Sequence, residues 1–382
     1  MKKIYIVYRS MFDAQGNVQS FGGIQNYILN LTDIFKAQAW DVHIVQPAKT
    51  PFVVEAKSYT VYGINTGFYR GNLKKYALTR WVKTRASRDD VIIFATDTYG
   101  VAMAKHNTLA IQHGISWDKP RQHKNMLWQL LASLNNQLKY LNYGRKSKAL
   151  VCVDHNFVNW YRTWFNADDK LFKVIYNFYQ EKISPADFAI KWQFNALDAG
   201  AKKPLKIIIA RRFVDYRGLK MIGPVIQSVL KKHPELEITF AGDGPLKPYL
   251  QSLFAAQNNV TFMQYGADES FDCHKNHHIA IIPTLGSEGT SLSMIEAMAA
   301  GCMVISTNVG GLSNLVIDGF NGRLTMPDAV ELEQALTAAV ENMTQTQTFA
   351  REGLRSIEHT CSKAHWGQQW VDVINALDVK QK

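Results

Sequence analysis

The sequence predicts an α/β protein made of two doubly wound halves, each a parallel sheet covered by helices. Short apolar runs alternate with segments of helical spacing along most of the chain, as strands and helices do in such proteins. Each half also opens in the order strand, glycine-containing loop, helix, strand, which is typical of nucleotide-binding folds. Because 382 residues exceed what one hydrophobic core usually supports, we expect two domains.

Residues 1–180 are expected to form the first domain. Its apolar runs predict strands at 3–8, 40–45, 90–96, 109–113, 149–153 and 172–176, and helical spacing predicts a helix after Tyr27. Leucines at helical spacing over 124–143 predict an amphipathic helix, which we expect to pack into the core. Because lysines and arginines flank it, this helix could instead lie on a membrane surface or shape an acceptor site.

The net charge of +11 is concentrated in the first half. Residues 61–90 are expected to be a helix plus loops. From Arg70 to Arg88 this segment holds seven basic side chains and no acid, interleaved with aromatic residues: Arg70, Lys74, Lys75, Arg80, Lys83, Arg85 and Arg88. A nucleic acid, an anionic membrane surface or a phosphorylated lipid acceptor could bind such a face, and a merely solvated basic face is an equal alternative.

Cysteine usage and hydropathy predict a cytoplasmic protein, with peripheral attachment to the inner face of the cell membrane as an option. Four scattered cysteines (Cys152, Cys273, Cys302 and Cys361) indicate buried, reduced thiols, because none forms a C-x-x-C pair. No apolar run approaches the length needed to span a bilayer. The apolar stretch at residues 4–8 is too short for a secretion signal.

The second half is expected to hold a linker at 181–204, a domain at 205–360 and a last helix in 361–382. Apolar runs predict strands at 205–210, 236–241, 260–263, 279–282 and 303–305. Helical patterns predict helices at 188–197, 219–231, 291–300, 329–343, 345–358 and 361–378.

Two carboxylates eight positions apart mark the strand, loop, helix and strand at 279–305. Glu288 precedes the expected helix and Glu296 lies inside it, roughly 12 Å apart along the helix axis. Between them, four backbone N–H groups would point out of a helix N-terminus and could hold a phosphate: those of Gly289, Thr290, Ser291 and Leu292. Two hydroxyl acceptors around an anion cradle fit a nucleotide sugar, whereas the alternative is two surface glutamates on a helix.

These residues resemble the E-x7-E motif of glycosyltransferase family 4, whose members have the GT-B fold of two Rossmann-like domains facing across a cleft. The resemblance also implies that the C-terminal helix in 361–382 crosses back and packs on the first domain. The resemblance implies that Glu288 contacts hydroxyls of the donor sugar and that Glu296 binds the ribose. It continues at residues 211–218, which are similar to the family's G-R-x4-K-G segment, and at the G-D-G-P of Gly242 and Gly244. There the resemblance implies a diphosphate clamp by Arg212 and Arg217 and a nucleotide pocket lined by the two glycines.

Two departures affect the clamp. Arg211 stands where the family has glycine, which leaves a one-position doubt in the register, and Arg217 replaces the lysine. Arginine keeps the charge but offers a planar fork of donors, so the clamp would survive with altered geometry. Asn177 matches a loop asparagine of the family but lacks the glycine that follows it, and we assign it no ligand role.

The first half resembles the family more weakly. Gly22 and Gly23 follow the first strand, and the resemblance places such glycines beside the donor phosphate and the acceptor. His113 ends the strand at 109–113, and the resemblance implies contact with the donor sugar or its phosphate. An uncharged imidazole could bond a sugar hydroxyl, and a charged one could assist departure of the phosphate.

No metal or cofactor is expected. The chain has no D-x-D pair, which argues against transferases that bind diphosphate through a divalent metal. Cys273, His274, His277 and His278 could suggest a metal site, but they lack a second matched ligand pair, and we expect a satisfied surface helix.

The resemblance implies a retaining, metal-independent transferase. It would move a hexose-type sugar from a nucleotide-diphosphate donor, UDP being favoured, to a hydroxyl of a glycan or lipid-linked glycan in bacterial surface polysaccharide synthesis. A GT-B epimerase or phosphorylase, or a basic protein that binds nucleic acid or membrane without catalysis, stays open as an alternative. We expect no nucleic-acid partner for the transferase.

Overall fold

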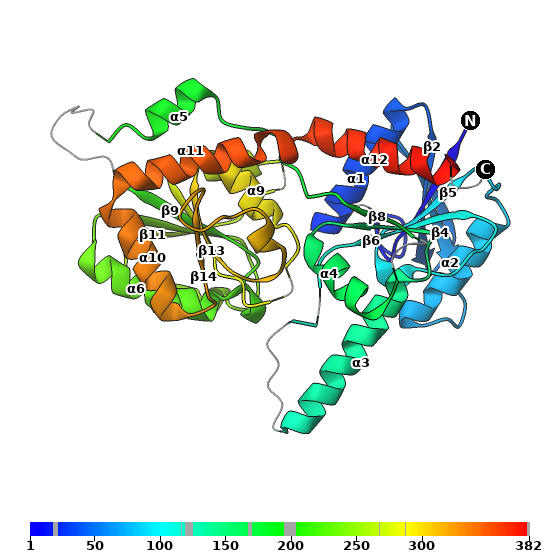
Figure 1. Ribbon diagram of the computed structural model, residues 1–382, viewed down its shortest axis with the longest axis horizontal. Coiled ribbons are helices and arrows are strands. Elements are labelled where there is room, and N and C mark those ends of the chain that lie inside the picture. The colour runs from blue at the N-terminus through cyan, green and yellow to red at the C-terminus, as the bar shows by residue number, and fades with distance from the viewer. Residues whose placement is uncertain are drawn as a thin grey trace. The chain divides into compact units, whose positions relative to one another are not determined.

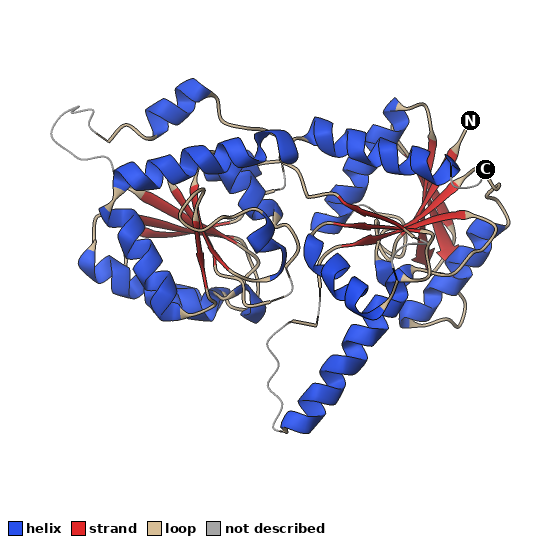
Figure 2. Ribbon diagram, viewed as in Figure 1, coloured by secondary structure: helices blue, strands red, loops and turns tan. Residues whose placement is uncertain are grey.

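The structure is a computed structural model that describes residues 1–17, 22–115, 117–118, 125–166, 170–194, 204–266, 268–286 and 288–379. It divides into two compact units. The first comprises Met1–His113, His123–Ile175 and Gly367–Lys382, and the second comprises Gly114–Gln122 and Tyr176–Trp366. In each unit helices cover both faces of one sheet (Figure 1; Figure 2). The predicted α/β class with two doubly wound halves is confirmed.

The first unit is built on an eight-stranded sheet in the order β3-β4-β2-β1-β5-β6-β7-β8. Its strands are β1 (Lys3–Val7), β2 (Asp41–Ala48), β3 (Phe52–Glu55), β4 (Thr60–Asn65), β5 (Val91–Phe94), β6 (Asn107–Gln112), β7 (Ala149–Cys152) and β8 (Leu171–Val174). Its helices are α1 (Gly23–Ala37), η1 (Gly71–Leu73), α2 (Lys74–Lys83), η2 (Asp97–Tyr99), α3 (Met126–Gly144) and α4 (His155–Trp164). Neighbouring strands are parallel except β3 and β4, which are antiparallel.

The second unit is built on a six-stranded parallel sheet in the order β11-β10-β9-β12-β13-β14. Its strands are β9 (Lys206–Ala210), β10 (Glu237–Ala241), β11 (Val260–Met263), β12 (Ile279–Ile282), β13 (Met303–Thr307) and β14 (Arg323–Thr325). Its helices are α5 (Pro185–Lys191), η3 (Asp215–Arg217), α6 (Leu219–Lys232), α7 (Lys247–Leu253), α8 (Ser270–Lys275), α9 (Leu292–Ala299), η4 (Gly310–Asn314), α10 (Ala329–Glu341) and α11 (Met343–Thr360). Apolar side chains fill both faces of this sheet.

The last helix, α12 (Lys363–Val379), contains residues of both units. Trp366 packs on Phe178 in the second unit, with ring centroids 4.2 Å apart. Trp370 belongs to the first unit, where its indole N–H donates to the Tyr27 hydroxyl at 3.0 Å. Both tryptophans are fully buried, so the helix is anchored at each of these turns.

Two expectations for the first unit were wrong. Residues 60–65 form β4, which pairs with β2, rather than part of a helix; Val61 and Gly63 alternate with half-buried neighbours, as a strand requires. Helix α3 does not pack into the core, because Leu141 and Gly144 are its only buried residues among those described. Figure 1 shows α3 extending away from the sheet of its unit.

All four cysteines are free and buried, as predicted. Within the described ranges, no helix combines the length and the apolar character needed to cross a bilayer.

Candidate functional site

The loops after β9 and β12 leave the sheet of the second unit side by side. β9 pairs with β10 on one side and with β12 on the other, so the strand order reverses between β9 and β12. Ligands of open α/β sheets bind at the carboxyl edge of such a reversal point. The segments 211–218, 283–286 and 288–291 therefore occupy the position where a ligand site is expected.

Glu288 is the centre of a polar cluster between these two loops. One of its carboxylate oxygens, Oε2, accepts bonds from the guanidinium groups of Arg211 and Arg217. Arg211 also donates to the hydroxyl of Thr284 at 2.7 Å and to that of Ser291 at 2.9 Å. The Glu288 side chain is only 10% exposed, so this is a buried ion pair and not a solvated surface residue.

The backbone around Glu288 is fixed by three further contacts. The N–H of Leu285 donates to the carbonyl of Tyr216 at 2.9 Å, which ties the two loops together. The N–H of Gly311 donates to the Glu288 carbonyl at 3.0 Å. Gly310 has a φ of +56°, and a Cβ there would lie 2.1 Å from the Glu288 carbonyl oxygen, so only glycine fits. Gly310 and Gly311 thus hold the backbone of Glu288 in place.

Two arginines share one carboxylate, which leaves a surplus positive charge. Burial lowers the pKa of Arg211 to about 10. Burial, followed by the like charge of Arg211, lowers the pKa of Arg217 to about 9. Both guanidinium groups therefore stay protonated at neutral pH, and the cluster attracts a further anion.

Helix α9 adds a second source of positive potential beside this cluster. Its first helical bond runs from the Ile295 N–H to the Ser291 carbonyl, so the amides of Leu292, Ser293 and Met294 have no acceptor within the helix. At the other end, the ammonium of Lys191 donates to the Ala300 carbonyl at 2.8 Å. The dipole of α9 thus points its positive end at the Glu288 cluster.

Glu296 lies on α9, half-buried, and not on an exposed helix surface. The hydroxyl of Ser270 donates to its Oε2 at 2.6 Å. Burial raises the pKa of this carboxyl, although the Ser270 bond opposes the shift. Glu296 therefore belongs to the interior side of the helix, with one oxygen held by a neighbouring element.

The register of the arginine clamp differs from the expectation. Arg212 is exposed and donates to the Tyr216 hydroxyl at 2.9 Å, whereas Arg211 is buried and reaches Glu288. Successive side chains of an extended segment point in opposite directions, so only one of these neighbours can face the loop after β12. The structure therefore places Arg211, and not Arg212, against Glu288, while the predicted role of Arg212 in binding the diphosphate stays a prediction.

Gly242 and Gly244 follow β10 and approach the arginine loop closely. Both have a φ of +148°. A Cβ on Gly242 would lie 2.0 Å from the Arg211 carbonyl oxygen, and one on Gly244 would lie 2.6 Å from the Phe213 carbonyl oxygen. Their lack of a side chain therefore lets the loop after β10 pack against the loop that carries the arginines.

Asn177 and Thr284 are contributors that the sequence did not assign. The side-chain amide of Asn177 donates to the Thr290 carbonyl, and its backbone N–H donates to the Thr290 hydroxyl at 3.1 Å. The asparagine match to the family was a usable signal for this contact. Thr284 lies two positions after β12, and no pattern in the sequence indicated that it would bond to Arg211.

The residues predicted in the first unit lie at its carboxyl edge. Gly22 caps α1, and its N–H donates to the Gln25 side chain at 3.2 Å; Gly23 begins the helix. His113 follows β6, where Nε2 lies 2.8 Å from the Ala95 carbonyl oxygen and the ring meets the edge of Tyr27. Burial lowers the pKa of His113 to about 4, which favours the uncharged imidazole and hence the hydrogen-bonding role considered for it.

The histidines near α8 are buried, which corrects the expected surface helix. Nδ1 of His274 lies 2.8 Å from the Ser270 carbonyl oxygen, and Nδ1 of His277 lies 2.8 Å from that of Cys273. The ring of His278 accepts from the Lys206 N–H at 3.0 Å. In the described part of the chain, no three His, Cys, Asp or Glu side chains are grouped so that they could hold a metal ion.

Comparison with known proteins gives a match for the same region. The family model described as "Glycosyl transferases group 1" matches residues 204–342. The sulfoquinovosyl transferase SQD2 of Arabidopsis thaliana is 25% identical over 210 residues, which are 54% of this chain and 38% of that protein. The chain thus matches well under two thirds of the length of this relative.

Solved structures match over the whole chain. The sucrose-phosphate synthase of Thermosynechococcus elongatus has a TM-score of 0.75 and 16% identity, and covers 100% of both chains. HepE of Anabaena, solved in complex with UDP, has a TM-score of 0.72 and 17% identity over 98% of this chain and 100% of its own. These likenesses confirm that the fold is GT-B.

Proposed function

The chain carries a domain of the glycosyl transferases group 1 family in a GT-B fold, and on that premise we propose that it transfers a hexose-type sugar from a nucleoside diphosphate to an acceptor hydroxyl. The observation that carries the proposal is the buried cluster of Arg211, Arg217 and Glu288 beside the N-terminus of α9. It combines surplus positive charge, free helix amides and a carboxylate at one edge of a sheet. A sugar diphosphate offers a dianion next to hydroxyl groups, and it matches each of these features.

Each member of the cluster has a proposed role. Arg217 keeps 14% of its side chain exposed and meets the donor diphosphate together with the α9 amides. Arg211, whose side chain is only 5% exposed, does not meet the donor itself but positions the side chains of Glu288 and Ser291 by bonding to both. Glu288 has Oε2 occupied by the arginines, so its Oε1 accepts a hydroxyl of the donor sugar. Glu296, about one turn along α9, accepts a ribose hydroxyl.

We propose that the reaction retains the anomeric configuration and needs no metal. The bond between the anomeric carbon and the diphosphate oxygen breaks while Arg217 and the helix amides stabilise the leaving charge. The acceptor oxygen then bonds to the anomeric carbon on the same face, and its proton passes to an oxygen of the departing diphosphate. The protein positions groups and stabilises charge, and no side chain becomes a nucleophile. Turnover that survives addition of EDTA would support this route, and loss of turnover would contradict it.

For the donor we favour a UDP-sugar, because the structural neighbour HepE was solved with UDP. For the acceptor we propose a glycan or lipid-linked glycan of a bacterial surface polysaccharide, made at the cytoplasmic face of the membrane. The basic side chains at 70–88 support an anionic or phosphorylated acceptor near the first unit.

Calorimetric titration with UDP, GDP, dTDP and ADP tests the proposal. We expect UDP to bind most tightly and Arg211→Ala to weaken UDP binding about tenfold or more, because Glu288 would lose one of its two arginines. The matched control is Arg212→Ala, which removes an equal charge from the neighbouring exposed position and should change the affinity less than about threefold. Absence of binding for all four nucleotides would contradict the proposed donor, and a larger effect of Arg212→Ala would contradict the register.

A further inference from the structure

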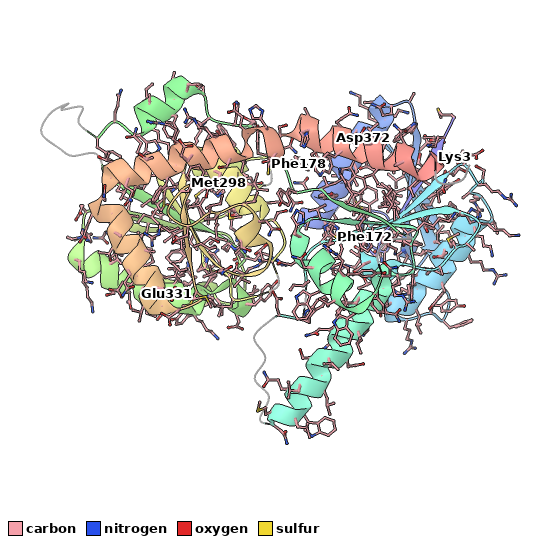
Figure 3. The ribbon with its side chains drawn as sticks, viewed as in Figure 1. Lys3, Phe172, Phe178, Met298, Glu331 and Asp372 are labelled. Carbon is pink, nitrogen blue, oxygen red and sulfur yellow. The ribbon has the colours of Figure 1, made fainter. Side chains whose placement is uncertain are left out.

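Helix α3 turns its apolar face away from the protein. Leucines at positions 127, 130, 131, 134 and 138 share one face of the helix, at the i, i+3, i+4 and i+7 spacing of an amphipathic helix. Seven large apolar side chains of the helix are between 37% and 77% exposed: Met126, Leu127, Trp128, Leu130, Leu131, Leu134 and Leu138. Figure 3 shows side chains of α3 projecting clear of the sheet of its unit.

Three polar residues of α3 lie on a side of the helix that is less exposed than the leucine stripe. Ser133, Asn136 and Gln137 are half-buried, and Asn136 and Gln137 bond within the helix, to Ala132 and Ser133. A helix that served the core would have the opposite orientation, with its leucines inward. Exposed apolar surface of this extent, on one contiguous stripe, marks a surface that something apolar covers.

The surroundings of the stripe are basic and aromatic. The described residues 125–153 contain no Asp or Glu, while Lys139, Arg145 and Lys148 are exposed. The base of α3 also adjoins the basic helix α2, because the ammonium of Lys75 lies 4.7 Å from the Tyr143 ring centroid.

Exposed aromatic side chains lie on neighbouring elements. Helix α4 adjoins the end of α3, since a Cβ on Gly144 would lie 3.3 Å from the Phe157 ring. On α4, Trp160 is 39% exposed and Trp164 is 44% exposed. Leucine, tryptophan and basic residues without acids are the composition of helices that lie in the interface of an anionic bilayer.

We propose that the stripe of Leu127, Leu130, Leu131, Leu134 and Leu138 docks the protein on the surface of an anionic phospholipid bilayer. The leucines enter the boundary between headgroups and acyl chains, and the basic residues near the base of α3 meet lipid phosphates. A second copy of this chain fits less well, because a self-interface would bring the basic surroundings of two helices together. The docking does not depend on the proposed transfer, but it favours an acceptor carried by a lipid, and that part rests on the proposed function.

The test is flotation of the full chain with vesicles of phosphatidylglycerol and phosphatidylcholine in equal parts, and with vesicles of phosphatidylcholine alone. The variant Leu131→Asn with Leu134→Asn removes the middle of the stripe without changing the charge. Its matched control, Gln129→Asn with Asn135→Gln, alters two exposed polar positions of the same helix. We expect the wild type and the control to float with the mixed vesicles. The partition coefficient of the leucine variant onto the same vesicles should be lower by about tenfold or more. Phosphatidylcholine alone and high salt should each weaken binding of the wild type.

Several results would overturn the docking. These are a wild type that stays off the mixed vesicles, a leucine variant that floats like the wild type, or equal binding to both vesicle types. A wild-type dimer that dissociates in the leucine variant, seen by analytical ultracentrifugation, would assign the stripe to a second copy. A melting temperature well below that of the control would show that the leucines pack inside the protein. Titration of the same preparations with UDP separates this outcome from failure of the proposed function.

Discussion

Helices α9 and α3 are both rich in apolar residues, yet the structure uses them in opposite ways. In α9, apolar side chains are buried on the sides that face the sheet and α11: Met294, Ile295, Ala297, Met298 and Ala299, with Met298 labelled in Figure 3. In α3, the leucines are exposed and only Leu141 and Gly144 are buried among its residues. One helix is held inside a core and aims its N-terminus at a polar cluster. The other leaves its apolar face uncovered.

The difference teaches that an apolar stripe predicts a non-aqueous partner without identifying it. Both helices lie between two strands of their sheet, β12 and β13 for α9 and β6 and β7 for α3. Flanking strands alone therefore do not decide which face of a helix is covered. The comparison can be tested by substitutions that should have large effects near α9 and small ones on α3.

The largest effect is expected at the cluster beside α9. Replacing Arg217 with alanine should lower kcat/KM about 10²-fold to 10³-fold, or about 3–4 kcal/mol, because a charge that stabilises the leaving diphosphate is lost. The free energy of unfolding should change much less, since Glu288 keeps its bonds to Arg211 and Thr284. Steady-state kinetics with a purified donor and acceptor, alongside urea unfolding, measure both. Arg217→Lys, which keeps the charge, should recover part of the activity, and turnover of Arg217→Ala close to that of the wild type would remove the clamp.

The second test compares the two helices directly. Ile295→Ala should lower the free energy of unfolding by about 2–4 kcal/mol, because Ile295 is fully buried in α9 and its loss leaves a cavity. Leu134→Ala removes a similar side chain from the exposed stripe of α3 and should change it by less than about 0.5 kcal/mol. Urea unfolding of both variants measures the contrast. Equal losses would mean that α3 is packed as α9 is.

A third test uses two buried histidines, His274 in α8 and His277 just after it; α8 packs on α9. Burial lowers the pKa of His274 and of His277 to about 4, below the ordinary value near 6.5. Between these values the unfolded chain binds more protons than the folded one, so the free energy of unfolding falls as the pH falls. The free energy of unfolding should have its full value well above pH 6.5 and should be lower by about 2 kcal/mol per imidazole at pH 5. Unfolding curves at several pH values measure the slope.

The variant His274→Gln is the control for that slope, and it should flatten the decline. A pH profile that is the same in the variant and the wild type would show that another group titrates. Helix α3 contains no histidine or carboxylate, so its exposed leucines provide no comparable dependence over this range.

The smallest effect is expected for Glu296→Gln. The amide keeps an oxygen for the Ser270 hydroxyl but removes the charge that would strengthen a bond to a ribose hydroxyl. UDP affinity should fall about fivefold, close to 1 kcal/mol, as measured by titration calorimetry. Unchanged affinity would exclude Glu296 from the nucleotide site.

The sequence predicted the architecture of the second unit well because its strands are short, apolar and bounded. Ile279–Ile282 was predicted with its final limits, since Pro283 ends the apolar run and the sheet buries both faces of the strand. The same reasoning missed β3 and β4 in the first unit, because both strands are short and β3 has no fully buried residue. Periodicity locates a helix such as α3, but which face meets protein depends on elements distant in the sequence.

The candidate site was predicted in outline, but the structure places Arg211 rather than the predicted Arg212 against Glu288. Glu288 was recognised from its spacing to Glu296, and the structure brings its carboxylate into contact with Arg217. The choice between Arg211 and Arg212 could not be made from the sequence, because it depends on which of two adjacent side chains faces the loop after β12. The partners Thr284 and Asn177 belong to other segments of the chain, and only the fold brings them to this loop.

The partial charges at the two ends of α9 are balanced to different extents by neighbouring charged groups. This difference affects the choice of buffer for the protein. A buried ammonium, that of Lys191, sits permanently at the carbonyl end, whereas the amide end faces a carboxylate that two arginines already share. Small oxyanions such as sulfate or inorganic phosphate should therefore occupy the amide end when no donor is present. Buffers that contain them would compete with a nucleotide, so affinities measured in such buffers would understate the strength of donor binding.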